Sequence, residues 1–230
     1  MKKFKISLIG LVIGAATVAI FLLWPRYSLA PTDPVSSDPA PSLPDSSPPP
    51  SPSLATASVP PPTLMPAVSL TPPIAEFKER ITKKPFGIYI TPATSPVQPE
   101  RFTGYHTGVD IEYADNLGKI PVQAISDGKV IQAGHVSGYG GVVVIEHQLS
   151  GTIRLALYGH LDPQDLPPVG APVKQGETIG QLGQGGTKET DGERKHLHFA
   201  ILKDRKIDLR GYVPTPSELE NWLDPQLLFP

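Results

Sequence analysis

The sequence predicts a mostly β fold, in which one compact β-sheet domain follows a transmembrane helix and a disordered linker. Three observations support this organisation. A long uncharged apolar run lies near the start of the chain, 15 of the 29 prolines fall between Pro31 and Pro73, and 18 of the 21 glycines follow Phe102. Residues 76–230 number 155 (230 − 75), which is the size of one ordinary domain with a core of its own.

The N-terminal segment, residues 1–30, is expected to be a cytoplasmic stub and a membrane anchor. Three lysines among the first five residues precede an apolar run from Ile6 to Trp24. Its 19 residues, at about 1.5 Å each in a helix, nearly match a hydrocarbon core of about 30 Å. Pro31 directly follows the cleavage-like Ser28-Leu29-Ala30, so we favour an uncleaved signal anchor over a cleaved signal peptide. The positive-inside rule then predicts a single-pass protein with its domain outside the cytoplasm, on the periplasmic or cell-wall side.

Residues 31–75 are expected to form a disordered Pro/Ser-rich tether. Proline triplets at 48–50 and 60–62 lie among Ser, Ala, Thr and Asp, with almost no aromatic side chain. Such a segment cannot bury enough apolar surface to offset the entropy of ordering its chain. At about 3.1 Å per residue, it could carry a domain up to roughly 140 Å from the lipid. A spacer is therefore favoured over a ligand for a proline-binding groove.

The domain at residues 76–230 has a β pattern. Short runs rich in β-branched or aromatic residues, separated by Gly, Asp or Pro, predict strands at 86–90, 129–133, 142–146, 152–158 and 197–202. One helix is expected near the end, where Thr215 provides an N-cap, Pro216 the first helical position and Glu218 a capping-box partner. We expect this helix to continue through residues 219–223 and to end before Asp224-Pro225.

Composition excludes several function classes. The chain has no cysteine, which excludes disulfides, thiolate metal sites and cysteine nucleophiles, so any metal must be held by His, Asp or Glu. Residues 76–230 contain 16 Lys+Arg and 19 Asp+Glu, a net charge of −3, and lack the basic excess of a nucleic-acid-binding domain. We therefore expect no nucleic-acid partner.

The spacing of the histidines indicates a metal site. In an extended strand, His196 and His198 point to one side and the apolar residues that alternate with them to the other. His106 and Asp110 add an imidazole and a carboxylate four residues apart, with Gly108 allowing a bend between them. Either pair alone is more often a coincidence on a solvated surface. Together they favour a zinc centre of two histidines and one carboxylate, with a fourth position open for a water that the metal activates.

Six motifs follow one another along the domain. They are HTGVD at 106–110, AISDGKV at 124–130, GYGGVVVIEH at 138–147, YGHL at 158–161, VKQGETIGQLG at 173–183 and HLHF at 196–199. In this order they resemble the motifs of the lysostaphin-like (LytM-type) zinc metalloendopeptidase family, which acts on bacterial peptidoglycan, and the resemblance covers about residues 86–229.

The resemblance implies an antiparallel β-sheet domain of the lysostaphin/LytM (duplicated hybrid motif) type with one Zn²⁺. It implies that His106, Asp110 and His198 bind the metal, and that His160 and His196 act on protons or on the developing oxyanion. The implied activity is hydrolysis of peptide bonds in peptidoglycan stem peptides or cross-bridges by a zinc-activated water, with a regulatory envelope protein as a further partner. The alternative is a non-catalytic module of the same fold that binds the wall or activates another hydrolase. The enzyme is favoured because none of the five positions is missing.

Two segments depart from the family pattern. Residues 93–102 stand where relatives have a Gly-x-Arg stretch, so one wall of the groove is expected to differ. Residues 188–195 form a longer and more charged loop before HLHF, for which a solvated face is favoured over a substrate contact. His147, Tyr139 and Tyr158 are expected to have structural rather than catalytic roles.

Overall fold

The computed structural model describes residues 69–229. The predicted membrane anchor at residues 1–30 and the predicted tether up to residue 68 lie outside the described residues. Within the described range, no helix is long and apolar enough to cross a membrane. The anchor and the location outside the cytoplasm therefore stay predictions.

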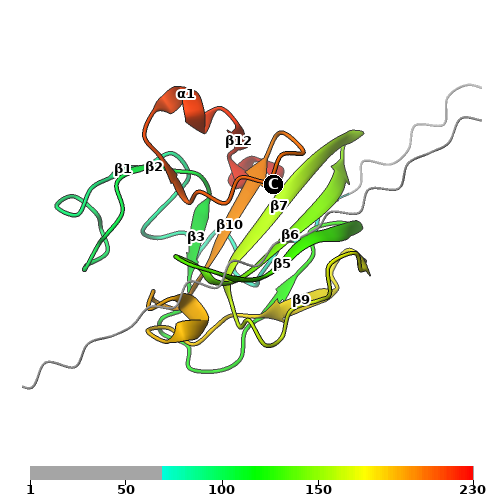
Figure 1. Ribbon diagram of the computed structural model, residues 1–230, viewed down its shortest axis with the longest axis horizontal. Coiled ribbons are helices and arrows are strands. Elements are labelled where there is room, and N and C mark those ends of the chain that lie inside the picture. Colours follow the sequence, from blue (N-terminus) through cyan, green and yellow to red (C-terminus); the bar gives the residue numbers. More distant parts are fainter. Residues whose placement is uncertain (1–68, 230) are drawn as a thin grey trace, which may run out of the picture. The chain divides into compact units, whose positions relative to one another are not determined.

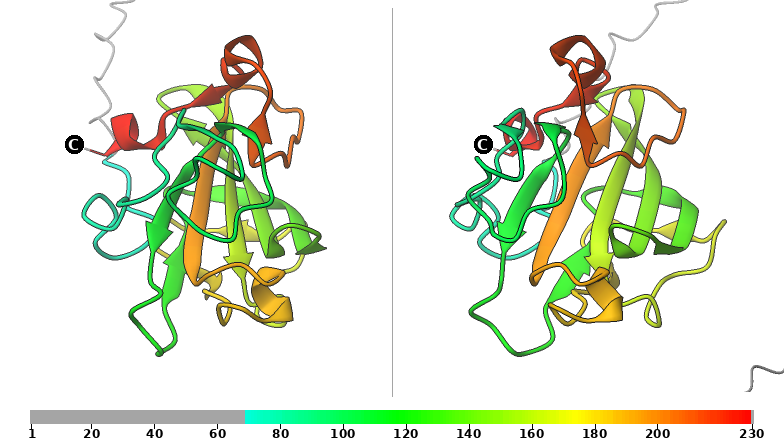
Figure 2. Two further views of the ribbon diagram at one scale, coloured as in Figure 1. Left: turned by 90° about the vertical axis from the view of Figure 1, so that its left-hand side faces the viewer. Right: turned by 60° about the vertical axis from the view of Figure 1, so that its left-hand side comes forward.

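The domain is built on one seven-stranded antiparallel sheet, with the strand order β12-β10-β7-β6-β5-β8 (Figure 1). The seventh strand, β3, pairs with the first half of β10, and β12 pairs with its second half. Figure 2 shows β3 in green directly beside β10 in orange. The bounds are β3 Val109–Glu112, β5 Gly128–Val136, β6 Gly140–Leu149, β7 Thr152–Leu161, β8 Pro172–Val173, β10 His196–Leu202 and β12 Trp222–Leu223.

Two small sheets and three short helices complete the described fold. One small sheet contains β1, β2 and β11, and the other contains β4 and β9. In Figure 1, β1 and β2 lie to one side of the large sheet, and the short helix α1 lies near β12. The bounds are β1 Tyr89–Ile90, β2 Gly104–His106, β4 Pro121–Gln123, β9 Thr178–Gln181, β11 Tyr212–Val213, α1 Pro216–Leu219, and the 3₁₀ helices η1 Lys188–Thr190 and η2 Pro225–Leu228.

The structure confirms the mostly β, antiparallel fold. Each of the five predicted strand segments contains a strand, and four of them lie in β5, β6, β7 and β10 at the centre of the large sheet. These four strands are longer than predicted at one or both ends, because cross-strand pairing extends them into polar and glycine-containing residues that have a low strand propensity of their own.

The predicted C-terminal helix is correct only in its first half. Thr215 caps α1, and its side chain accepts a hydrogen bond from the backbone N–H of Glu218. The helix ends at Leu219 rather than near Leu223. Residues 222–223 form β12 instead, because pairing with β10 and burial of Trp222, which is 2% exposed, outweigh the local helical pattern.

The folded domain includes residues 69–75, which the sequence assigns to the tether. Ile74 is 2% exposed and belongs to the main core. The backbone N–H of Thr71 donates to the carbonyl oxygen of Ile125 at 3.0 Å, and the side chain of Gln175 donates to the carbonyl oxygen of Ser69 at 2.6 Å. The ordered packing therefore includes Ser69, although the composition of residues 69–75 resembles that of the tether.

The main core lies on one face of the large sheet. Leu197 and Phe199 of β10 point into this core, whereas the residues that alternate with them, His196 and His198, lie on the opposite face, as the sequence predicts. Phe77 from the start of the domain and Phe229 from its end pack with Phe199, and the three ring centroids lie 4.9–6.4 Å apart. The core therefore holds β10 from one face and leaves its histidine face to the candidate site.

Candidate metal centre and cavity

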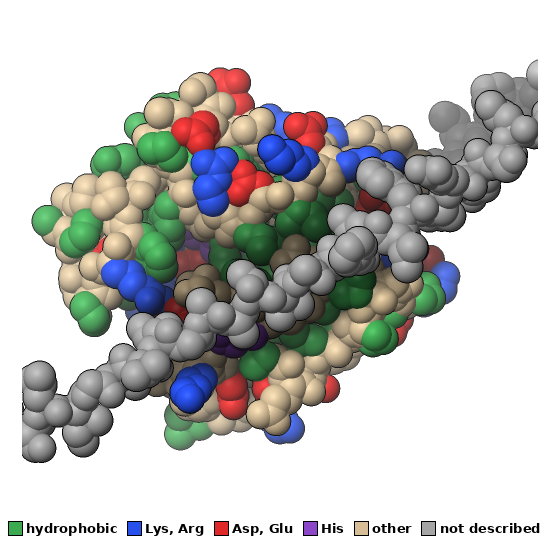
Figure 3. Space-filling view, viewed as in Figure 1, with side chains coloured by type: hydrophobic (Ala, Val, Ile, Leu, Met, Phe, Trp, Pro, Cys, Tyr) green, Lys and Arg blue, Asp and Glu red, His purple; other side chains and the backbone are tan. Residues whose placement is uncertain are grey.

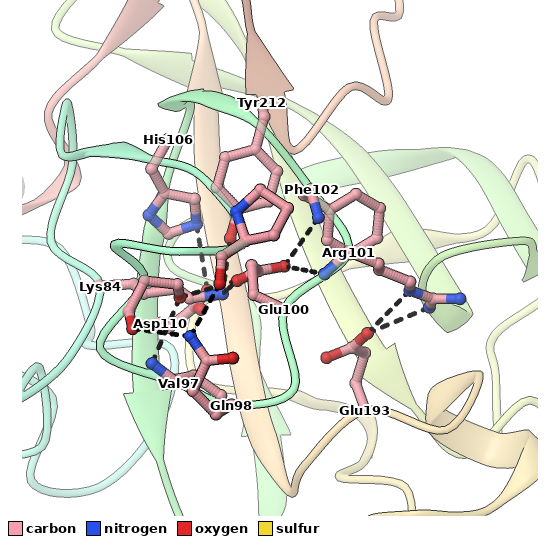
Figure 4. Close-up of polar contacts among 12 residues, drawn as sticks. Lys84, Val97, Gln98, Glu100, Arg101, Phe102, His106, Asp110, Glu193 and Tyr212 are labelled. Carbon is pink, nitrogen blue, oxygen red and sulfur yellow. Dashed lines mark hydrogen bonds and ion pairs between the residues drawn. The ribbon is translucent and has the colours of Figure 1, made fainter.

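Three side chains predicted to bind a metal converge at one point. The Nε2 atom of His106, the Oδ1 atom of Asp110 and the Nδ1 atom of His198 lie 3.1–3.2 Å from one another. All three residues are buried, and together they form a group that could hold a metal ion. Figure 4 shows the side chains of His106 and Asp110 pointing toward each other.

The sheet register brings these side chains together from distant parts of the chain. Asp110 on β3 lies directly opposite His198 on β10, so the two side chains are cross-strand neighbours. Gly108, between β2 and β3, packs against the backbone of β10: an added Cβ would contact the carbonyl oxygen of Phe199 and lie 2.9 Å from its carbonyl carbon. The glycine is therefore required for the close approach of β3 and β10, rather than for the bend expected from the sequence.

The three ligand atoms fit a zinc ion. Zinc bonds of 2.0–2.1 Å in a regular tetrahedron separate neighbouring ligand atoms by about 3.3 to 3.4 Å. The observed separations of 3.1–3.2 Å are close to that value. Nδ1 of His106 lies 3.2 Å from the carbonyl oxygen of Pro85. Because a carbonyl can only accept a hydrogen bond, Nδ1 is the protonated nitrogen of the ring, and the lone pair of Nε2 is directed at the other two ligand atoms.

Two further histidines lie beside this group. The rings of His160 and His196 have centroids 4.2 Å apart. Nδ1 of His196 donates to the carbonyl oxygen of Arg194 at 2.8 Å, so Nε2 carries the free lone pair. Nδ1 of His160 is buried and has no hydrogen-bond partner among the described residues. His160 also has a φ of 63°, a conformation that costs a non-glycine residue about 1–3 kcal/mol and that clusters at functional sites.

Burial and neighbouring charges set the protonation of the centre. Burial alone would raise the pKa of the Asp110 carboxyl, but the neighbouring side chains of His196, His106 and Arg194 favour the ionised form and hold that pKa well below its usual range. Burial lowers the pKa of His160 to about 3 and also lowers the pKa values of His196 and His198. At neutral pH the Asp110 carboxyl is therefore ionised and the rings of His160, His196 and His198 are neutral, the forms that bind a metal.

A cavity of about 310 Å³ opens beside the group. Asp110, His160, His196 and His198 line it, together with aromatic and cationic residues from other loops. Figure 3 shows charged side chains of both signs around the rim of one face of the domain, with hydrophobic and histidine side chains deeper between them. The structure thus brings four of the five predicted site residues into one cavity, with His106 directly beside it, while their roles stay predictions.

A buried ion pair that the sequence did not predict supports the His106 side of the centre (Figure 4). Nζ of Lys84 lies 2.6 Å from Oε2 of Glu100, and both side chains are 3% exposed. Lys84 also donates to the hydroxyl of Tyr212 at 3.0 Å, and the Tyr212 ring stacks on His106 with centroids 5.1 Å apart. Lys84 is 128 residues from Tyr212, so no local pattern could predict the contact. The only sequence signal is that Glu100 lies in the departing segment 93–102.

The charged loop before β10 is not a solvated face at its C-terminal end. Nη2 of Arg194 lies 2.8 Å from Oδ2 of Asp110 and 2.6 Å from Oε1 of Glu112, and the Arg194 side chain is 13% exposed. Lys195 is 6% exposed and donates to the carbonyl oxygen of Gly118. The solvated-face interpretation of residues 188–195 is therefore wrong for these two residues. The physical reason is that two carboxylates on one face of β3 attract the guanidinium.

The residues expected to be structural divide into two kinds. Nδ1 of His147 donates to a backbone carbonyl at 3.0 Å, and its Nε2 accepts from the hydroxyl of Tyr158 at 3.3 Å, which confirms a structural role for both. Tyr139 differs, because its ring centroid lies 5.3 Å from those of His160 and of His198. Its buried hydroxyl has no partner among the described residues and lines the cavity.

The domain thus combines an antiparallel β-sheet with a buried His–Asp–His group. Residues 104–209 match the model described as Peptidase family M23, and this range contains all five predicted site residues. This part of the chain therefore matches peptidase family M23, which confirms the resemblance found in the sequence.

Relatives of this domain differ in their described roles. The chain is 38% identical over 109 residues to a Lipoprotein NlpD/LppB homolog of Pseudomonas aeruginosa, covering 46% of this chain and 33% of the relative. It is 43% identical over 82 residues to the Murein hydrolase activator EnvC of Escherichia coli, covering 36% and 18%. It is 38% identical over 113 residues to the Glycyl-glycine endopeptidase ALE-1 of Staphylococcus capitis, covering 49% and 29%. The chain thus spans at most a third of each of these relatives.

Solved structures with a similar chain trace include that of LytU. It shares 28% sequence identity with this chain, covers 64% of this chain and 82% of its own, and gives a TM-score of 0.42.

Proposed function

We propose that the domain is a zinc metalloendopeptidase that hydrolyses peptide bonds in the stem peptides or cross-bridges of peptidoglycan. One observation carries the proposal. The ligand atoms of His106, Asp110 and His198 converge within 3.2 Å of one another, beside a cavity lined by two more histidines. A metal with three protein ligands keeps a fourth position for water or substrate, which is typical of catalytic zinc. A relative described as a glycyl-glycine endopeptidase supports peptide hydrolysis.

In this proposal, His106, Asp110 and His198 hold one zinc ion. Bound zinc would supply Lewis acidity, which activates water and polarises a peptide carbonyl. Nε2 of His196 accepts the proton of the attacking water, because its Nδ1 proton is already donated to a backbone carbonyl. The water oxygen bonds to the carbonyl carbon, the peptide C–N bond breaks, and the proton passes to the leaving nitrogen. His160, whose Nδ1 is buried without a hydrogen-bond partner among the described residues, would stabilise the developing oxyanion.

The test uses the full-length chain in detergent and measures zinc content and peptide release from purified peptidoglycan. We expect about one zinc per chain, and cleavage that a chelator stops and added zinc restores. Asp110→Ala should lower zinc occupancy. His160→Ala should keep zinc and lose turnover by roughly 10²–10⁴-fold, the usual contribution of a positioned proton-transfer group. Loss of zinc from His160→Ala would contradict this division of roles.

A second candidate function is the activation of a separate wall hydrolase without cleavage by this domain. The observation that favours it is the 43% identity over 82 residues to a protein described as a murein hydrolase activator. Wild-type protein that binds no zinc and releases no peptide, but increases the activity of an added murein hydrolase, would support this candidate. The complete set of five residues favours the enzyme.

We also propose that residues 1–30 anchor the protein in the membrane, with the domain outside the cytoplasm at the end of a Pro-rich tether. The sequence supports this through the uncharged apolar run and the lysines before it. Shortening residues 31–68 should then reduce activity on intact cells but not on soluble wall fragments. Equal loss on both substrates would contradict the role of a tether.

A further inference from the structure

We propose that Arg194 is a positioning residue for the metal centre, whose side chain turns one oxygen of Asp110 toward the metal by holding the other. The inference rests on the proposed function, because it requires that His106, Asp110 and His198 bind a metal. It concerns a residue of the charged loop at 188–195, where this chain departs from the family pattern.

The two oxygens of the Asp110 carboxylate have different partners. Oδ1 faces the candidate ligands, 3.2 Å from Nε2 of His106 and 3.1 Å from Nδ1 of His198. Oδ2 accepts a hydrogen bond from Nη2 of Arg194 at 2.8 Å. Asp110 is 2% exposed, so water cannot replace this partner freely. The guanidinium therefore fixes the rotation of the carboxylate that presents Oδ1 to the metal.

A second carboxylate holds the guanidinium in place. Nε of Arg194 donates to both oxygens of Glu112, at 3.0 and 2.9 Å, and Nη2 donates to Oε1 at 2.6 Å. Glu112 is two residues after Asp110 on β3, so both carboxylates lie on one face of the strand. Arg194 thus spans both with a planar fork, a geometry that a lysine ammonium cannot reproduce.

The backbone at residue 194 is fixed relative to the centre as well. The carbonyl oxygen of Arg194 accepts from Nδ1 of His196 at 2.8 Å, which joins the loop to the first residue of β10. Nε2 of His196 lies 3.5 Å from Oδ2 of Asp110, outside hydrogen-bond distance for an ideal contact. Because the ring proton of His196 is on Nδ1, its Nε2 carries only a lone pair and cannot donate to this oxygen, so Arg194 is the donor that Oδ2 of Asp110 receives.

The test compares full-length wild type with Arg194→Met, Arg194→Lys and the matched control Arg101→Met. Arg101 is also an arginine in an ion pair beside the cavity, but it binds Asp191 and Glu193 rather than a candidate ligand. Zinc affinity is measured by competition with a chromophoric chelator, and the visible spectrum of the Co²⁺-substituted protein reports ligand geometry without any turnover. Thermal unfolding of the metal-free variants separates folding from metal binding.

We expect Arg194→Met to weaken zinc binding 10–100-fold, the usual effect of removing a residue that orients a metal ligand. Its Co²⁺ spectrum should change, Arg194→Lys should recover part of the affinity, and Arg101→Met should bind zinc within about twofold of wild type. Should Arg194→Met not fold, Arg194→Lys carries the comparison alone, with an affinity below that of wild type expected.

Two results would overturn the inference while the proposed function stands. One is wild-type zinc affinity and an unchanged Co²⁺ spectrum in the Arg194 variants, and the other is an equal loss in Arg101→Met. Wild-type protein that binds neither metal would instead reject the proposed function and this inference with it.

Discussion

Replacing Gly108 by alanine tests whether the close contact of β3 with β10 holds the metal centre together. An alanine Cβ at this position would meet the carbonyl oxygen of Phe199 and would lie 2.9 Å from its carbonyl carbon. An ordinary van der Waals contact begins at 3.4 Å, so the carbonyl carbon alone requires the two backbones to separate by at least about 0.5 Å, which is 3.4 Å minus 2.9 Å, and the nearer carbonyl oxygen requires more. Both atoms of the obstacle belong to the backbone, so no side-chain rotation relieves the contact.

The separation should affect both stability and metal binding. Overpacking of this kind costs about 1–3 kcal/mol, and each kcal/mol lowers Tm by roughly 2–4 °C for a domain of this size. We therefore expect a decrease of about 2–12 °C. The distance from Oδ1 of Asp110 to Nδ1 of His198, now 3.1 Å, would grow by a similar 0.5 Å. Because a functional constellation tolerates only about 0.5 Å of displacement, zinc should bind at least roughly tenfold more weakly.

Scanning calorimetry of the metal-free protein and a chelator competition for zinc measure the two effects separately. Gly118→Ala is the matched control, because Gly118 is exposed and its only close neighbour is the side-chain oxygen of Asn116 at 3.1 Å. If Gly108→Ala had the Tm and the zinc affinity of Gly118→Ala, the reasoning about the β3–β10 contact would be refuted.

Two further predictions concern buried polar groups. Glu100→Gln leaves the ammonium of Lys84 buried without its counter-charge and should lower the free energy of unfolding, measured in urea, by about 3–5 kcal/mol. The control Arg205→Gln removes an exposed ion pair and should lower it by at most about 1 kcal/mol. Equal decreases in the two variants would contradict the argument. Burial lowers the pKa of His147 below its ordinary value of 6.5, so the folded state binds a proton less readily than the unfolded state. Wild type should therefore lose stability relative to His147→Gln by up to about 1.4 kcal/mol per pH unit as the pH falls below 6.5. If the difference in unfolding free energy between the two proteins were the same at pH 7.5 and at pH 5.5, His147 would not make stability depend on pH in this way.

The fold was predictable where local pattern and tertiary pairing agree. The runs that became β6 and β7 are rich in Val, Ile and Leu, and in β10 the alternation of histidines with Leu197 and Phe199 correctly separates the core face from the site face. At Trp222 the local helical pattern and the tertiary pairing disagree. The capping signals at Thr215 start a helix correctly, but partners on β10 that are distant in sequence decide the structure that follows.

The candidate site was predictable for side chains with unusual spacing and not for the residues that hold them. The pairs His106 with Asp110 and His196 with His198 together indicated a metal site, and the family resemblance assigned its three ligands. Arg194 lay in a charged run that resembles many solvated surfaces, and its contact with Asp110 depends on the register of β3 against β10. No local sequence pattern indicated the role of Lys84, because its hydrogen-bond partners are 16 and 128 residues away in the sequence.

The packing of Phe77 against Phe229, with ring centroids 4.9 Å apart, brings the two ends of the domain to the same patch of the core. A domain with adjacent ends can be inserted into a loop of a host protein, or circularly permuted, with little change to its interior. A Gly/Ser linker between residues 229 and 69, which keeps Ile74 in the core, with new ends opened at the exposed Leu117–Gly118 turn, should therefore yield a folded permutant.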